Sequence, residues 1–247
     1  MANITDNIRN NSQVIRRCQR NWDHSKIIPH EHIELLGEVA KNSPAKQDEA
    51  YFDVYVVNDR DLIEELYKNS DGFTTGVAEG KEFEVWPNSQ TRANVVFCWS
   101  ARQPTSMRNY YQDNTDYEAF DRSNKGIDNE KTPGTPKDPN EWSRNIENTY
   151  TSMGISMACV AQAAAQLGYV TGFNKNFGNF DEVIELPQTE TEYLRYTLGI
   201  GFPMEDLPHY VDNEGREFLS YSLQSERENK IVEVTLEDGK IIKNKLA

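Results

Sequence analysis

The stretch NTYTSMGISMACVAQAAAQL, residues 148–167, is made almost entirely of small and apolar side chains. Such side chains surround every face of a helix drawn through it, so we expect a helix that is buried all round and closely approached by its neighbours. Gly168 follows directly, as is typical of a helix C-terminus. The next residues, GYVTGFNKNFGN at 168–179, are rich in Gly and Asn and predict a loop.

Working outward, the remaining elements are short and mixed. Helical spacing of apolar residues predicts helices over 29–41, 61–68 and 189–198. Aromatic and β-branched runs predict strands over 51–57 and 94–99, the second apolar enough to be buried on both faces. Asp238-Gly239 between alternating segments predicts a hairpin over about 231–245. Because no regular βαβ alternation appears, we expect an α+β fold.

One long polar stretch interrupts this pattern. Residues 112–144 are dense in Asp, Asn, Lys, Pro and Gly, with TPGTPKDPN at the centre. A stretch this long inside one domain is usually a functional lid or an insertion. We therefore expect a single domain over 1–247 that carries a polar insertion at about 112–144.

The charge balance excludes several classes of partner. The chain has 26 Lys+Arg and 40 Asp+Glu, a net charge of −14. This charge argues against nucleic acid and against an anionic membrane surface. No apolar run is long enough for a membrane helix, and the start does not resemble a secretory signal. Three scattered cysteines, Cys18, Cys98 and Cys159, suit a reducing compartment, so we expect a cytoplasmic protein, with Cys98 and Cys159 in the core.

Common catalytic motifs are missing from the sequence. It contains no GxGxxG, GxxxxGK[ST], HExxH or GxSxG pattern. His30 and His32 stand two apart and would point to different faces of a helix, so no metal site is expected. A chain with no evident set of catalytic side chains often leaves the chemistry to a cofactor.

A cluster of arginines stands out in this acidic chain. Arg16, Arg17 and Arg20 fall within five positions. Guanidinium groups recognise phosphate by paired hydrogen bonds, so the cluster can form an anion site. The alternative is a solvated surface whose charges pair with nearby Asp or Glu, and residue type alone leaves both open.

Several segments resemble the nitroreductase family of FMN-dependent oxidoreductases. RRCQRNW (16–22), HIELLGEVAKNSPAKQ (32–47) and YFDVYVV (51–57) resemble the opening of that family, which carries an RRSxRxF-like motif. WPNSQTRANVVFCW (86–99), SMGISMACVAQAAAQLGYVTGF (152–173) and LGIGFP (198–203) resemble its later segments in the same order. The resemblance covers about residues 14–216. It implies a central, mostly antiparallel sheet flanked by helices, in an intertwined homodimer with FMN sites at the interface.

The resemblance also implies a set of cofactor-binding residues. The arginines would hold the FMN phosphate, the ribityl chain or the polar edge of the flavin, and Arg216 would also reach the phosphate. The turn at 45–47 would touch the flavin of the partner subunit, the amides at 88 and 90 would read its polar atoms, and 175–176 would present a backbone N–H to N5. The full set is Arg16, Arg17, Cys18, Arg20, Ala45, Lys46, Gln47, Asn88, Gln90, Lys175, Asn176 and Arg216. Cys18 stands where the family usually has Ser, and Asp48 where it has Asn.

The activity that the resemblance implies is hydride transfer from NADH or NADPH, through flavin N5, to a small acceptor such as a nitroaromatic or a quinone. No side chain would be catalytic in its own right. The departures at Cys18, Ala45 and Asp48 leave two alternatives open: a flavin protein of the same fold with a dedicated substrate, and an interaction protein without cofactor. The sequence does not decide between NADH and NADPH.

Overall fold

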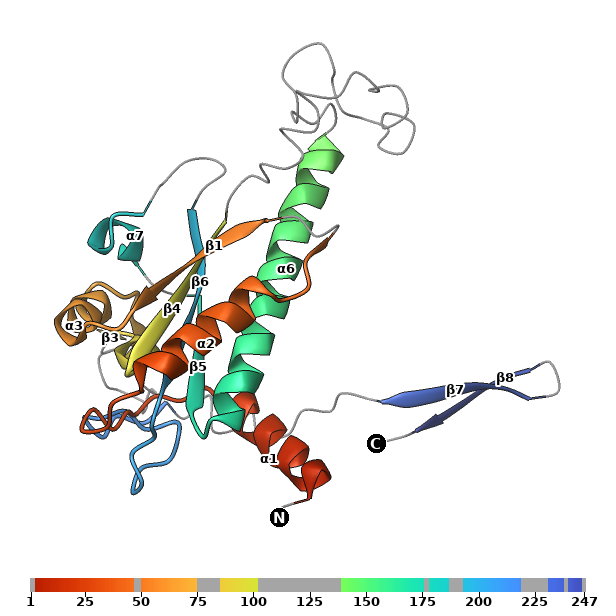
Figure 1. Cartoon of the computed structure of the whole chain (residues 1–247), viewed down its shortest axis with the longest axis horizontal. Coiled ribbons are helices and arrows are strands. Elements are labelled where there is room, and N and C mark those ends of the chain that lie inside the picture. Colours follow the sequence, from red (N-terminus) through yellow and green to blue (C-terminus); the bar gives the residue numbers. More distant parts are fainter. Residues whose placement is uncertain are drawn as a thin grey trace, which may run out of the picture.

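The computed structural model describes residues 3–46, 50–74, 85–101, 139–175, 178–186, 193–218, 231–237 and 240–245. One four-stranded antiparallel sheet lies at the centre, in the order β1-β4-β6-β5 (Figure 1). Its strands are β1 (Phe52–Val57), β4 (Val95–Ala101), β5 (Val170–Asn174) and β6 (Tyr193–Gly201). With helices packed around this sheet, the chain is an α+β protein, as the sequence predicts.

Helices cover both faces of the sheet. On one face, α2 (His30–Lys41) and α6 (Pro139–Gln166) lie side by side, with α1 (Ile4–Arg16) next to the C-terminal end of α6 (Figure 1). On the other face lie α3 (Arg60–Lys68), the 3-10 turn η2 (Ser89–Arg92) and the short α7 (Phe180–Val183). Trp99 and Leu198 belong to the core on the α6 side, and Trp22 and Val96 to the core on the α3 side.

Four expected elements, α2, α3, β1 and β4, are confirmed with nearly the same bounds. Helix α2 follows Pro29, and α3 begins after Asp59, whose carboxylate accepts the N–H of Leu62 at 2.9 Å as an N-cap. Strand β4 is buried along its whole length, as a continuous apolar run predicts. Helix α1 is an addition, because the sequence indicated only a cationic segment at its end.

The long helix α6 differs from the helix expected over 148–167 in its length and in its burial. It has 28 residues and begins at Pro139, inside the stretch expected to be an insertion; residues 112–138 lie outside the described residues. It is also not buried all round, since Thr151, Gly154, Ile155 and Ala158 form an exposed strip and Cys159 is only half-buried. The sequence did not reveal the exposed face, because small residues such as Ala and Gly occur on buried and on exposed faces of helices.

Two local predictions at the sheet are wrong. Residues 170–174, expected in a loop, form β5, and the segment expected to be helical over 189–198 contains the first part of β6. β6 hydrogen-bonds to β4 on one side and to β5 on the other. Pairing on both sides outweighs the helical spacing of a few apolar residues, which is a weak local preference.

The remaining strands form two small ladders. β2 (Phe73–Thr74) pairs with β3 (Val85–Trp86), and β7 (Val232–Glu237) pairs with β8 (Lys240–Lys245). The β7–β8 ladder lies apart from the main body (Figure 1) and agrees with the expected hairpin, although Asp238 and Gly239 themselves lie outside the described residues. Among the described helices, none combines the length and the apolar character needed to cross a bilayer.

Candidate functional site

We call the segment RRCQRNW, residues 16–22, the arginine motif, and its second half is buried. Gln19, Arg20, Asn21 and Trp22 are each at most 4% exposed. The backbone N–H of Gln19 donates to the carbonyl of Thr171 in β5 at 2.9 Å. The Asn21 amide donates to the carbonyls of Pro208 and Val211, each at 2.7 Å. This segment therefore joins the edge of the sheet to the loop that follows β6.

Trp22 lies on a patch of glycines. A Cβ placed on Gly172 or Gly201 would come within 3.3 Å of the Trp22 ring, and one on Gly199 within 3.4 Å. The indole N–H donates to the carbonyl of Ser89 in η2 at 2.8 Å. The glycines therefore allow the ring to approach the sheet closely, and the ring fixes the position of η2.

Three predicted segments meet at the C-terminal end of β5. The amide of Gln90 donates to the carbonyl of Phe173 at 2.6 Å, and the Cys18 thiol approaches the same carbonyl at 3.9 Å. Lys175 follows β5 directly and is exposed. The arginine motif, the 88–90 turn and the end of β5 are thus brought together, although they lie about 70 residues or more apart in sequence.

The three arginines of the motif differ in exposure. Arg16 ends α1 and is half-buried, and Arg17 caps that helix and is exposed. Arg20 is 1% exposed and stacks over the Phe218 ring, 4.4 Å from its centroid. Burial, together with the charges of Arg17 and Arg20, lowers the pKa of His209. Arg16 and Arg17 can therefore reach a ligand from the surface, whereas Arg20 is part of the core.

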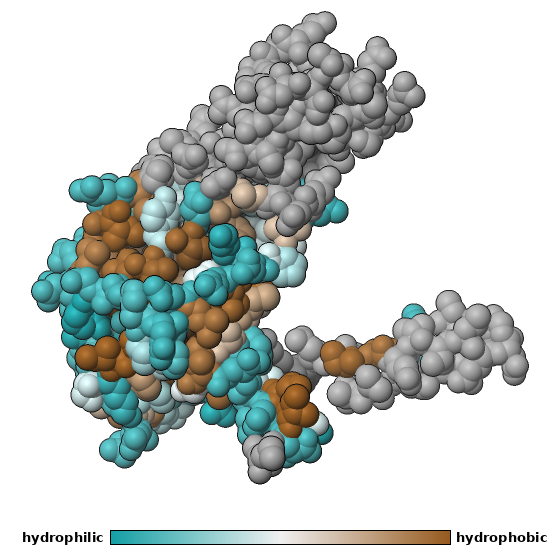
Figure 2. All heavy atoms as spheres, viewed as in Figure 1, coloured by the Kyte–Doolittle hydropathy of each residue, from teal (hydrophilic) through white to brown (hydrophobic). Residues whose placement is uncertain are grey.

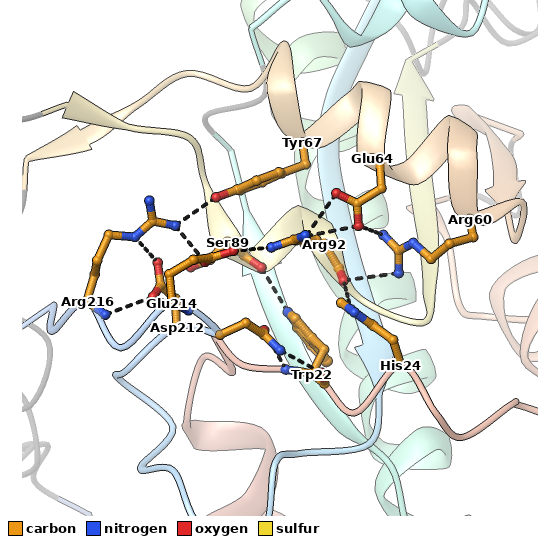
Figure 3. A network of polar contacts seen from close by, with 11 residues as sticks. Trp22, His24, Arg60, Glu64, Tyr67, Ser89, Arg92, Asp212, Glu214 and Arg216 are labelled. Carbon is orange, nitrogen blue, oxygen red and sulfur yellow. Dashed lines mark hydrogen bonds and ion pairs between the residues drawn. The ribbon is translucent and has the colours of Figure 1, made fainter.

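Arg216 belongs to a network of charged groups (Figure 3). Its guanidinium donates to the buried carboxylate of Asp212 at 2.5 Å and to Glu214 at 2.7 Å. It also donates to the Tyr67 hydroxyl at 2.9 Å and lies 4.3 Å from the centroid of the Trp86 ring. Arg216 as a phosphate ligand stays a prediction, and in this structure its donors hold the 212–216 turn.

The same network continues to α3. Arg92 at the end of η2 contacts Glu64 at 2.9 Å and also pairs with Glu214 (Figure 3). Arg60 contacts Glu64 at 3.1 Å and donates to the carbonyl of Ala93 at 2.9 Å. Sequence reasoning missed these carboxylates, because nothing local marks an acidic residue in an acidic chain as the partner of a distant arginine.

The other predicted residues are placed as follows. The side chain of Asn88 caps η2 by accepting the N–H of Gln90 at 3.1 Å. The backbone N–H of Lys46 donates to Ser152 of α6 at 3.3 Å, beside half-buried Ala45. Gln47 and Asn176 lie outside the described residues. The 45–46 turn contacts the middle of α6, whereas the arginine motif lies along β5, so one chain does not unite these two parts of the predicted site.

The donors near the end of β5 suit an anionic nucleotide. The side chains of Arg16, Arg17 and Lys175 supply positive charge, and the Gln90 amide contacts the Phe173 carbonyl of β5. The hydroxyls of Ser89 and Thr171 are buried and have no hydrogen-bond partner among the described residues. Charge and donor chemistry therefore fit a phosphate-bearing ligand such as FMN.

Comparisons with known proteins identify the fold. No family model and no curated protein matches the chain. Among solved structures, nitroreductase A from Vibrio parahaemolyticus is 14% identical with a TM-score of 0.53, over 84% of this chain and 72% of that one. A nitroreductase-like protein from Streptococcus mutans is 17% identical with a TM-score of 0.52, over 84% and 94%.

A third similar structure is a proposed NAD(P)H:FMN oxidoreductase from Staphylococcus epidermidis. It is 13% identical with a TM-score of 0.54, over 84% of this chain and 90% of that one. At these identities the likeness shows the fold alone. The chain therefore has a nitroreductase-like fold, as the resemblance of its motifs implied.

Proposed function

We propose that this protein is an FMN-dependent oxidoreductase that passes two electrons from NADH or NADPH to a small acceptor such as a nitroaromatic or a quinone. One observation carries the proposal: the arginine motif, the 88–90 turn and the end of β5 converge in a nitroreductase-like fold. The chain has no catalytic motif of its own, which agrees with chemistry supplied by a cofactor.

Each residue of the site then has a binding or positioning role. Arg16 and Arg17 hold the phosphate, because both can reach solvent from the end of α1. Gln90 orients the end of β5 through the Phe173 carbonyl, and the backbone of Lys175 would present an N–H to the flavin. FMN, when bound, would supply the hydride chemistry that links the nicotinamide to the acceptor. The Lys175, Arg16 and Arg17 charges would attract the anionic cofactor.

The absorption spectrum of the purified protein tests this proposal. We expect a yellow protein whose flavin bands bleach on addition of NADH or NADPH under nitrogen. Arg16→Ala should weaken FMN binding about tenfold or more, which is the usual loss for a charged hydrogen bond. Arg9→Ala is the matched control, because Arg9 lies on the same helix, is exposed, and its side chain forms an ion pair with exposed Asp6.

The outcomes separate the alternatives. A yellow protein that NADH and NADPH reduce, but that reduces neither nitro compounds nor quinones, would favour a dedicated substrate. A colourless protein that takes up no added FMN would favour an interaction protein without cofactor. Equal FMN affinity in Arg16→Ala and Arg9→Ala would contradict the role given to the arginine motif.

We further propose that the protein is a homodimer in which the 45–46 turn completes the site of the partner. Hydrophobic surface reaches the exterior of the chain in several places (Figure 2), and Ile4, Ile8 and Leu35 are 74%, 58% and 44% exposed. Gly154 lies in the exposed strip of α6 and has no atom within 4 Å of a built Cβ in the single chain.

Gly154 provides a test of the dimer. In an isolated chain Gly154→Ala should stabilise α6 by up to about 1 kcal/mol, because Ala favours a helix. Where a second copy covers this strip, the added methyl should instead weaken association, seen by sedimentation at micromolar protein. Gly37→Ala in α2, at another helical glycine with open space around it, is the control. A wild-type protein that sediments as a monomer would overturn the proposal.

A further inference from the structure

Three tyrosines and one arginine gather between α6 and β6. The Arg195 guanidinium lies 3.6 Å from the centroid of the Tyr193 ring and 5.3 Å from that of Tyr150. The rings of Tyr150 and Tyr196 meet edge to face, with their centroids 6.2 Å apart. All four residues are half-buried, so each keeps accessible surface. We call this set the tyrosine–arginine cluster.

A β-bulge creates the cluster. Trp99 of β4 pairs with Tyr196 and the next residue, Ser100, pairs with Leu194, so Arg195 is an extra residue without a partner in β4. Without the bulge, Tyr193 and Tyr196 would point to opposite faces of the sheet, because side chains alternate along a strand. With it, both pack on the α6 side, and Leu194 packs on the other side. Bulges that redirect side chains are common beside active sites.

Arg195 differs from several other half-buried arginines in its partners. Among the described residues, no carboxylate forms an ion pair with it, and its Nε is buried without a hydrogen-bond partner there. By contrast, Arg60, Arg92 and Arg216 each pair with a carboxylate. The faces of the tyrosine rings attract the guanidinium group. The N–H donors of the guanidinium lie in its own plane, so they stay available to another acceptor.

The cluster lies at the same end of β5 as the candidate site. Asn174 is the last residue of β5 and pairs with Thr197, so Tyr196 and Arg195 are the next residues along β6 beyond that end. Phe173, whose carbonyl receives the Gln90 amide, pairs with Leu198. Gln90 approaches β5 from the η2 face and the cluster packs on the α6 face, so an acceptor would contact the cluster by extending beyond the last residue pair, Asn174–Thr197.

We infer that the tyrosine–arginine cluster selects an acceptor that carries a carboxylate on an aromatic ring. The Arg195 fork binds the carboxylate through two N–H donors, and the tyrosine rings contact the ring of the acceptor. A neutral acceptor of the same shape leaves the guanidinium without this partner. Arg195 is thus a specificity-determining residue, and this inference rests on the proposed function for the identity of the ligand as an electron acceptor.

A pair of matched acceptors tests the inference. The holoenzyme is assayed with 4-nitrobenzoate and with 4-nitrobenzamide, which share a ring and differ in charge. We expect kcat/KM to favour the carboxylate by about tenfold to a hundredfold, the usual range for a charge-assisted pair. Arg195→Gln should abolish this preference, and Arg195→Lys should keep part of it. Arg9→Gln removes the same charge from an exposed position and should leave the preference unchanged.

Two further readouts separate the sources of failure. If Arg195→Gln keeps the wild-type preference for 4-nitrobenzoate over 4-nitrobenzamide, the inference is overturned. A change confined to the KM of NADPH would also overturn it, because the arginine would then bind a phosphate of the reductant. FMN occupancy and thermal melting of each variant show whether the fold survives. If the wild-type protein binds no flavin, calorimetric titration of 4-nitrobenzoate still tests the cluster, since wild type should bind it more tightly than Arg195→Gln.

Discussion

Gly199→Ala should destabilise the protein, because the space at this position is already filled. A Cβ there would stand 2.3 Å from the carbonyl oxygen of Gln90 and 2.9 Å from the Cβ of Ala93. Ordinary contact begins near 3.4 Å, and both neighbours belong to the backbone or to a short side chain that cannot turn away. The sheet and η2 would have to separate, which also loosens Trp22.

The expected loss is about 2–3 kcal/mol of unfolding free energy, in the upper range for overpacking, since the crowded atom is a carbonyl oxygen. For a chain of this size that corresponds to a fall in Tm of roughly 4–12 °C. Urea unfolding followed by tryptophan fluorescence and by circular dichroism measures the change. Gly37→Ala is the control: nothing lies within 4 Å of its built Cβ, and a gain of up to about 1 kcal/mol is expected.

The reasoning is refuted if Gly199→Ala unfolds at the same urea concentration as the wild type. A loss shared equally by Gly37→Ala would also refute it, because the effect would then come from replacing glycine in general. A large loss in Gly199→Ala alone supports the close contact of sheet, η2 and Trp22.

Three other predictions concern single groups. Burial raises the pKa of the Cys98 thiol to about 12, so maleimide should modify the other two cysteines in the native protein and Cys98 only after unfolding, as mass spectrometry would report. Asp212→Asn should cost about 3 kcal/mol in urea unfolding, because it leaves Arg216 beside a buried neutral group; Asp6→Asn, at an exposed pair, should cost little. The pKa of His209 is lowered in the folded state, so the unfolded chain binds the proton more readily. The free energy of unfolding should therefore fall as the pH drops from about 7.5 to 5.5, and the fall should be smaller in His209→Gln.

Much of the secondary structure could be predicted from local patterns. Helices α2 and α3 and strand β4 follow from spacing, caps and a continuous apolar run, each of which acts within a few residues. The resemblance to nitroreductases implied that the segments around Cys18, Gln90 and Lys175 share one site, and in the structure Cys18 and Gln90 both contact the Phe173 carbonyl. The exposed strip of α6 was not predicted, since small residues do not reveal which face of a helix is covered.

The sequence by itself determined the α+β class of fold and the long small-residue helix, and it indicated a group of arginines whose role it left open. Only the tertiary structure decided how those residues are used: Arg16 and Arg17 remain accessible, Arg20 is in the core, and Arg216 is tied to Asp212. It also decided that 170–174 is a strand and that a bulge places Arg195 between two tyrosines. The physical reason is that strand pairing and ion pairing join residues far apart in sequence, and their energies exceed the local preferences from which a sequence is interpreted.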